Sequence, residues 1–192
     1  SVTNAMLAGS IANSKLANSS ITLNGSAVSL GGSASAGIAV ADMWRLTTTF
    51  NGSAEPISSN WERVDTYGFG QLGTGMTESS GIFTFPSTGF YNLRFYATLD
   101  EDGGGNSNEI NGKIQHTTNN SNYNDVSNGA TMLFNSPSNG TMTAVAESIF
   151  DVTDTSTHKA RFAVTGNGSG NRVIGNSNTN QTYAVFIRLG DT

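Results

Sequence analysis

The segment spanning residues 80–92 reads SGIFTFPSTGFYN, and it limits the possible folds more than any other part of the chain. Apolar and small or polar residues alternate on both sides of a Pro-Ser-Thr-Gly turn, so that Phe83 and Phe85 share one face and Tyr91 begins a second alternating run. Alternation at period two is typical of a strand with one buried face, and Pro and Gly supply turn geometry. The segment predicts a β-hairpin with one buried face.

Short alternating segments separated by turn residues continue along the chain from residue 39. Only 12% of the residues are charged, and Gly, Ser, Thr and Asn are abundant, which favours strands and turns over helices. Regularly spaced short strands predict an all-β sandwich or jelly roll. The expected strands are 43–50, 62–67, 81–85, 90–99, 110–116, 130–134, 141–152, 157–164 and 183–189, and the expected exposed loops are 100–108, 117–128 and 166–181.

Large apolar residues recur every five positions near the start of the chain, at Met6, Ile11, Leu16 and Ile21. This step resembles the pentapeptide pattern of β-solenoids, in which each coil turns one large residue inward. So short a segment cannot bury its own apolar row. It is therefore either a flexible leader or a stalk whose apolar row is buried by identical chains together.

An Asn-Gly pair follows at residues 24–25, between alternating segments at 21–23 and 27–30, and it predicts a tight hairpin. The Gly/Ser-rich stretch 31–37 reads as a linker. We therefore expect a short N-terminal β stalk with its linker over residues 1–36, and a jelly-roll head over residues 37–192.

Composition excludes several classes of partner and site. Nine basic against fourteen acidic residues give a net charge of −5 without any basic cluster, so nucleic acid is not expected as a partner. The chain has no cysteine, which excludes disulfides and thiol chemistry. No apolar run reaches the roughly 20 residues that span a bilayer, so no membrane insertion is expected.

The central segment resembles the C1q-like branch of the C1q/TNF jelly rolls. Gly81, Phe83, Pro86, Gly89 and Tyr91 follow the order and spacing of that family's consensus. The stretches 44–47 (WRLT) and 183–187 (YAVFI) are similar to its first and last strands. The resemblance implies an all-β C1q/TNF-like jelly-roll sandwich that assembles as a homotrimer and binds proteins, glycans or cell surfaces.

The leader at residues 2–25, followed by a linker and a C1q-like head, resembles virion fibre and appendage proteins of tailed bacteriophages, particularly cyanophages. This resemblance implies a non-enzymatic virion protein, located on the extracellular particle, that contacts other virion proteins and binds a host-surface glycan or protein. One alternative is a decoration or joining protein without a host ligand. A second, less favoured alternative is a fibre-associated glycan hydrolase.

The acidic run Asp100, Glu101 and Asp102 is the densest cluster of carboxylates. Three carboxylates could bind calcium, and two could act in glycan hydrolysis. The spacing does not match an EF-hand, and a glycine-rich loop does not fix the distance between two catalytic carboxyl groups. We therefore expect a solvated acidic turn, with neither a metal, a cofactor nor a catalytic site.

Three aromatic residues near predicted loops, Trp61, Tyr67 and Tyr123, are the candidate ligand-binding residues, because a ring face can stack on a sugar. Most other aromatic residues occupy alternating strand positions that predict core packing. The two histidines, His116 and His158, have no acid or nucleophile at a characteristic spacing. They are expected to lie exposed at strand ends.

Overall fold

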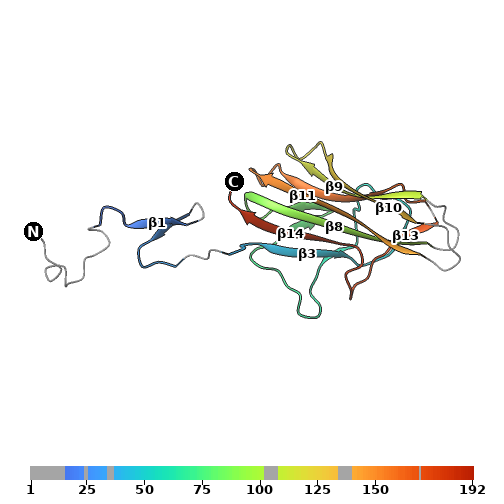
Figure 1. Cartoon of the computed structure of the whole chain (residues 1–192), viewed down its shortest axis with the longest axis horizontal. Coiled ribbons are helices and arrows are strands. Elements are labelled where there is room, and N and C mark those ends of the chain that lie inside the picture. Colours follow the sequence, from blue (N-terminus) through green and yellow to red (C-terminus); the bar gives the residue numbers. More distant parts are fainter. Residues whose placement is uncertain (1–15, 24–25, 34–36, 102–107, 134–139, 169) are drawn as a thin grey trace, which may run out of the picture. The chain divides into compact units, whose positions relative to one another are not determined.

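The computed structural model describes residues 16–23, 26–33, 37–101, 108–133, 140–168 and 170–192 (Figure 1). The chain separates into two compact units, Ser1–Gly37 and Ile38–Gly190. All elements of regular structure in the described parts are β-strands. None of these residues belongs to a helix that could cross a membrane.

The first unit contains one antiparallel hairpin, formed by β1 (Ser20–Leu23) and β2 (Ser26–Ser29). Its register pairs Leu23 with Ser26, which confirms the two-residue connection predicted from Asn-Gly. The turn itself and most of the five-residue repeat, including Met6 and Ile11, lie outside the described residues. Of the repeat, Leu16 and Ile21 are exposed in the single chain.

The second unit is a sandwich of two antiparallel sheets, which confirms the predicted jelly-roll class (Figure 1). One sheet has the order β10-β9-β12-β7-β6. The other has the order β11-β8-β14-β3-β5. At the end of β8, strand β13 pairs with its last residues, and β4 pairs with β13. The strands are β3 (Ala41–Leu46), β4 (Phe50–Asn51), β5 (Trp61–Arg63), β6 (Thr77–Ser79), β7 (Ile82–Thr84), β8 (Gly89–Glu101), β9 (Asn108–Thr117), β10 (Asn124–Leu133), β11 (Thr141–Val152), β12 (Lys159–Thr165), β13 (Asn171–Val173) and β14 (Tyr183–Gly190).

Aromatic rings from both sheets meet in the core. Phe162 of β12 stacks on Phe95 of β8 with ring centroids 4.9 Å apart, and Phe83 of β7 lies 5.1 Å from Phe186 of β14. These four rings are fully buried. The inward positions of the alternating pattern therefore fill the space between the sheets, and burial of this apolar area stabilises the sandwich.

The central segment is not a hairpin, which corrects the prediction for residues 80–92. Strand β7 pairs with β6 and β12, whereas β8 pairs with β11, β13 and β14, so the chain crosses from one sheet to the other between them. Phe85 and Tyr91 face each other across this crossing, with ring centroids 4.7 Å apart. A hairpin and a crossing share the same alternation, because both place one face of each strand against the core.

Several predicted boundaries also change. Strand β5 ends at Arg63, so Tyr67 lies in the following loop. The predicted loop 117–128 includes the beginning of β10, and the tract 166–181 includes β13. Strand β10 thus begins at Asn124 rather than at residue 130, and β13 was missed because its three residues include only one apolar side chain.

Candidate functional site

The outward side of the β11-β8-β14-β3 sheet carries an unusual set of apolar side chains. Residues directly opposite each other in neighbouring antiparallel strands point to the same side of a sheet. The register therefore aligns three rows across this side, which we call the outer face: Ala41, Ile187, Asn92 and Ile149; Met43, Val185, Arg94 and Glu147; Arg45, Tyr183, Tyr96 and Val145.

Apolar residues on the outer face are substantially accessible to solvent. Ile149 is 64% exposed and Val145 is 48% exposed, both on β11, and Phe90 on β8 is 38% exposed. Tyr96 and Tyr183 stack with ring centroids 4.5 Å apart and are half-buried. Strands β11, β8, β14 and β3 run side by side in Figure 1, so that these side chains lie on one continuous face.

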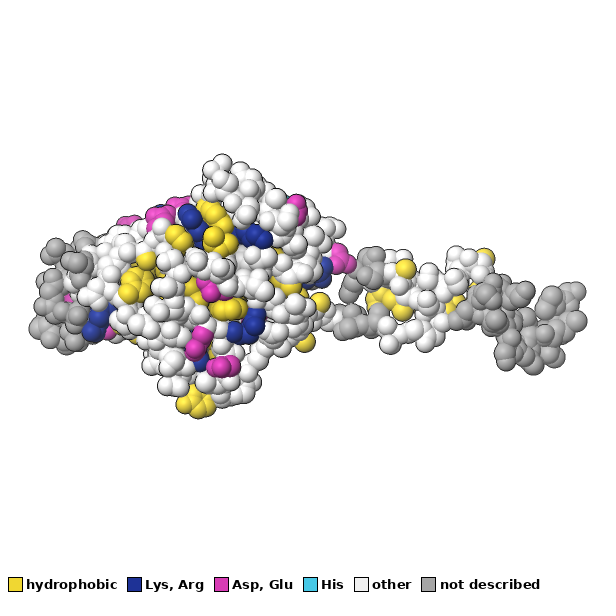
Figure 2. All heavy atoms as spheres, turned by 180° about the vertical axis from the view of Figure 1, so that it is seen from behind, with side chains coloured by type: hydrophobic (Ala, Val, Ile, Leu, Met, Phe, Trp, Pro, Cys, Tyr) yellow, Lys and Arg dark blue, Asp and Glu magenta, His cyan; other side chains and the backbone are white. Residues whose placement is uncertain are grey.

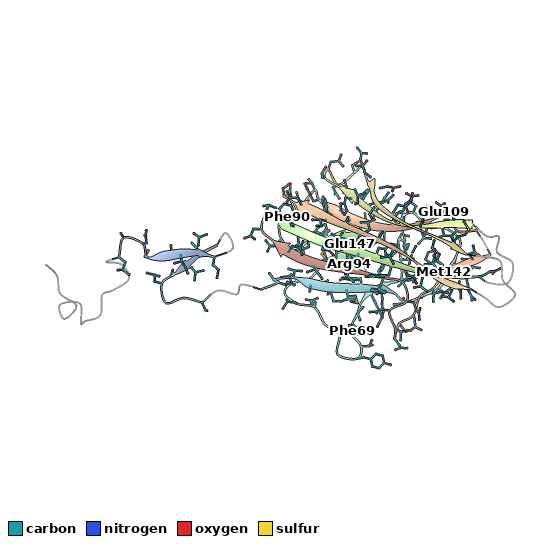
Figure 3. The ribbon with its side chains drawn as sticks, viewed as in Figure 1. Phe69, Phe90, Arg94, Glu109, Met142 and Glu147 are labelled. Carbon is teal, nitrogen blue, oxygen red and sulfur yellow. The ribbon has the colours of Figure 1, made fainter. Side chains whose placement is uncertain are left out.

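An ion pair occupies the middle of the outer face (Figure 3). Arg94 Nε donates to Glu147 Oε1 at 2.8 Å, and Asn92 Nδ2 donates to the same oxygen at 2.7 Å. These hydrogen bonds hold the pKa of Glu147 below its ordinary value, and the bond to Glu147 raises the pKa of Arg94. The two charges therefore pair with each other within the face, and apolar residues such as Ile149, Val145 and Val185 lie in the aligned rows around them.

Viewed from the side opposite to Figure 1, the head shows hydrophobic side chains only in small groups separated by polar surface (Figure 2). The other sheet also carries charged contacts on its outward side: Lys113 Nζ lies 2.8 Å from Asp125 Oδ2, and Gln115 Nε2 donates to Asp125 Oδ1 at 2.5 Å. The other sheet also exposes two apolar side chains, Val126 and Met132 on β10, so the outer face differs from it in carrying apolar residues on several adjacent strands.

The acidic run does not converge on one point. Asp100 receives two hydrogen bonds from Arg172, at 2.8 and 2.7 Å, whereas Glu101 is buried on the inward side of β8. Asp102 lies outside the described residues. Among the residues whose structure is described, no three His, Asp or Glu side chains group in a way that could hold a metal ion.

Two of the three candidate aromatic residues are unsuited to ligand binding. Trp61 is buried in the core, 5.4 Å from the ring of Phe83, and its indole N–H donates to the Ile57 carbonyl at 2.8 Å. The Trp61 ring is therefore part of the core and is not presented at the surface. Tyr123 is half-buried with the guanidinium of Arg161 4.1 Å above its ring, so one ring face is already covered.

Tyr67, the third candidate, is the most exposed large hydrophobic side chain in the described part of the head, with 81% of its surface accessible. Phe69, two residues further along the same loop, is 48% exposed. Sequence analysis did not single out Phe69, although the alternation of aromatic residues and glycines in YGFG was a visible signal. The loop between β5 and β6 thus presents two rings to solvent.

The histidine prediction is wrong for His116. Its ring is buried and stacks on Phe150 with centroids 3.9 Å apart, and its Nε2 lies 3.3 Å from Ser148 Oγ. Burial lowers the pKa of His116 to about 4. His158 contacts the same Phe150 ring at 5.5 Å and is half-buried. These two histidines, distant in sequence, meet at one phenylalanine.

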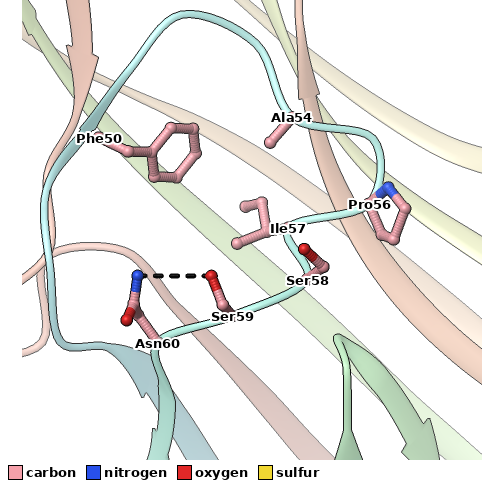
Figure 4. Close-up of a pocket in the computed structure, with 7 residues that line it drawn as sticks. All are labelled: Phe50, Ala54, Pro56, Ile57, Ser58, Ser59 and Asn60. Carbon is pink, nitrogen blue, oxygen red and sulfur yellow. Dashed lines mark hydrogen bonds between the residues drawn. The ribbon is translucent and has the colours of Figure 1, made fainter.

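A small pocket of about 160 Å³ lies beside the connection from β4 to β5 (Figure 4). It is lined by Phe50, Ala54, Pro56, Ile57, Ser58, Ser59 and Asn60. Ligand and cofactor pockets usually enclose about 300 Å³ or more. No ionisable side chain is among these lining residues, so they offer no acid or base and no carboxylate or imidazole ligand for a metal.

Similar folds occur among solved structures. Murine APRIL matches with a TM-score of 0.56 and 11% identity, over 78% of this chain and 98% of that chain. Eiger TNF from S. frugiperda matches with a TM-score of 0.56 and 14% identity, over 79% of this chain and 93% of that chain. No protein-family model and no curated protein matches the sequence. The head therefore has a TNF-like jelly-roll fold.

Proposed function

We propose that this chain is a non-enzymatic, homotrimeric module of a tailed-phage fibre or appendage, and that its head binds a glycan or protein on the host surface. The observation that carries the proposal is the apolar outer face. Monomeric proteins rarely expose large contiguous apolar patches, and such patches commonly mark interaction surfaces. The phage assignment is supported by the resemblance of the leader and linker to virion fibre proteins.

A second copy of the chain is the partner that best suits the outer face. The stacked Tyr96 and Tyr183 and the exposed Ile149 form an apolar surface, while the internally paired Arg94 and Glu147 need no opposite charge from a partner. Interfaces between identical subunits are more apolar than other protein surfaces. Symmetric assembly would also bring three N-terminal stalks together, so that apolar residues such as Leu16 could be buried between chains.

Light scattering on the full chain and on a version beginning at Gly37 tests the assembly. We expect three times the single-chain mass for the full chain. Ile149→Lys should dissociate the trimer, since each of three lysines would enter the apolar contact. Val126→Lys is the matched control, because Val126 is a 45% exposed aliphatic side chain on β10 of the other sheet. A monomeric full chain would contradict the proposal.

Binding of the labelled trimer to cells tests the attachment function. We expect the wild-type protein to bind at least one strain in a panel of marine cyanobacteria, and the Ile149→Lys monomer to bind less tightly because it loses multivalency. A trimer that binds no strain would instead favour the role of a virion decoration or joining protein.

A further inference from the structure

The loop between β5 and β6 has a fixed stem. Arg45, which is 1% exposed, donates to Thr66 Oγ1 at 2.9 Å and thereby holds the first half of the loop. At the other end, the buried carboxylate of Asp42 accepts from the Met76 amide at 2.7 Å. Leu72 and Ala41 exchange two backbone hydrogen bonds at 2.8 and 3.2 Å. The stem is therefore anchored to β3 at three points.

The tip of this loop is a tight turn that carries aromatic rings. The Phe69 amide donates to the Thr66 carbonyl at 3.1 Å, and Tyr67 has a φ of 54° in the left-handed region. This conformation is uncommon for a bulky residue, and such strain is often found at functional sites. Tyr67 and Phe69 are largely exposed although their backbone is held in place. Figure 3 shows Phe69 on the loop that extends away from β3.

A second loop, at residues 176–181, meets the tip from the side of β14. Thr66 Oγ1 donates to the Asn178 carbonyl at 3.4 Å, which places the two loops next to each other. Asn176 Oδ1 accepts from the amides of Asn178 and Thr179 at 2.8 and 3.0 Å, and this turn leaves Asn178 exposed. The exposed Asn178 thus belongs to a turn that contacts Thr66, the residue before Tyr67.

The charged side chains near the loop tip indicate whether a neutral or an anionic ligand would bind there. No Lys, Arg or His occurs in residues 64–76 or 174–182. Two arginines contact the stem of the loop, and both are paired with carboxylates. The buried Arg45 lies 2.5 Å from Glu62 and 3.4 Å from the 77% exposed Asp65, and Arg63, which is 34% exposed, lies 3.0 Å from Asp42. Because residues 64–76 carry no cation and both arginines at the stem are already paired with carboxylates, this surface suits a neutral ligand better than an anion. The polar groups near the rings favour a ligand that carries hydroxyl groups. They do not favour a protein partner that would enclose the rings in an apolar pocket.

We propose that Tyr67 and Phe69, with Asn178 and Asp65 beside them, form the glycan-binding site of the head, and that the site takes neutral sugars. An aromatic ring packs against the C–H face of a pyranose, while amide and carboxylate groups bind its hydroxyls. This inference rests on the proposed function, and it specifies both the ligand class and the loops that make contact.

The test uses the whole chain of residues 1–192 and an array of purified bacterial surface polysaccharides, neutral and acidic, together with maltoheptaose, mannohexaose and chitohexaose. Affinity for the best-bound glycan is then measured by calorimetry. We expect a neutral glycan to bind, Tyr67→Ala to weaken its affinity by about tenfold, since an aromatic contact contributes up to about 1.5 kcal/mol, and Tyr67→Phe to retain it. Tyr123→Ala is the matched control and should bind as the wild type does.

Three outcomes would overturn the site: no neutral glycan bound by the wild type, unchanged affinity in Tyr67→Ala, or loss of the trimer in Tyr67→Ala, which would make the loop an assembly contact. Treating the cells with periodate or with protease before binding separates failure of the glycan site from failure of the proposed attachment function. Cell binding that resists periodate but is lost after protease treatment would leave the attachment function intact and refute the glycan ligand.

Discussion

Lowering the pH should destabilise the head through His116. Because its ring is buried against Phe150, the folded protein binds a proton at His116 only near pH 4, whereas an unfolded histidine does so near 6.5. Between these values the unfolded state takes up the proton and the folded state does not, so stability falls as the pH falls. The stabilisation is complete above about pH 7 and is lost progressively down to pH 4.

The size of the effect follows from the difference between the two pKa values. A difference of one unit corresponds to about 1.4 kcal/mol, so the full loss below pH 4 is on the order of 3 kcal/mol. Between pH 7 and pH 5 the expected loss is roughly 2 kcal/mol. This is a large fraction of the roughly 5 to 15 kcal/mol that stabilises a typical domain.

Urea unfolding at several pH values, at one fixed protein concentration, measures this loss. His116→Phe keeps a ring of similar size against Phe150 but cannot be protonated. Subtracting its pH profile from that of the wild type removes the contributions of the acidic residues. We expect the difference to grow by roughly 2 kcal/mol from pH 7 to pH 5. Parallel profiles, or an NMR titration of His116 near pH 6.5, would refute the reasoning.

Three substitutions test the core and the crossing between the sheets by chemical unfolding. Phe83→Ala should cost about 3 to 5 kcal/mol, because it leaves a cavity among fully buried rings; a cost below about 1 kcal/mol would contradict the packing. Gly89→Ala should cost about 1 to 3 kcal/mol, since Gly89 has a φ of 137° and a Cβ would collide with the Gly190 carbonyl; a neutral change would disprove this close approach. Tyr91→Phe should cost about 1 kcal/mol through loss of the hydrogen bonds to Ser87 at 3.0 and 3.1 Å, and an unchanged stability would show that these bonds contribute nothing.

Local sequence patterns predicted the strands well where one face is apolar. The range 141–152 matches β11, and the predicted strand 90–99 lies within β8, because both alternate apolar and polar residues along their length. Strands β6 and β13 were missed, since only three residues pair in each and few of these are apolar. Short polar strands are held by backbone hydrogen bonds to neighbours that are distant in sequence, so their own residues carry little signal.

The candidate site could be predicted only in part. Tyr67 was identified from its position near a loop, and the structure shows it exposed. The same reasoning included Trp61, which fills the core between the sheets, because an aromatic residue before a strand can point either way. The neighbouring Asn178 was not identified, since it lies more than a hundred residues from Tyr67 and joins it only through folding.

By itself, the sequence determined the class of fold, the alternation of buried and exposed positions, the hairpin near the N-terminus and the absence of thiol chemistry. These depend on local properties: side-chain polarity at period two, turn residues and composition. Only the tertiary structure decided that residues 80–92 cross between sheets, that His116 is buried and that apolar residues of four strands form one outer face. These depend on which strands pair and in what register, and that choice is made by contacts between distant residues in the packed core.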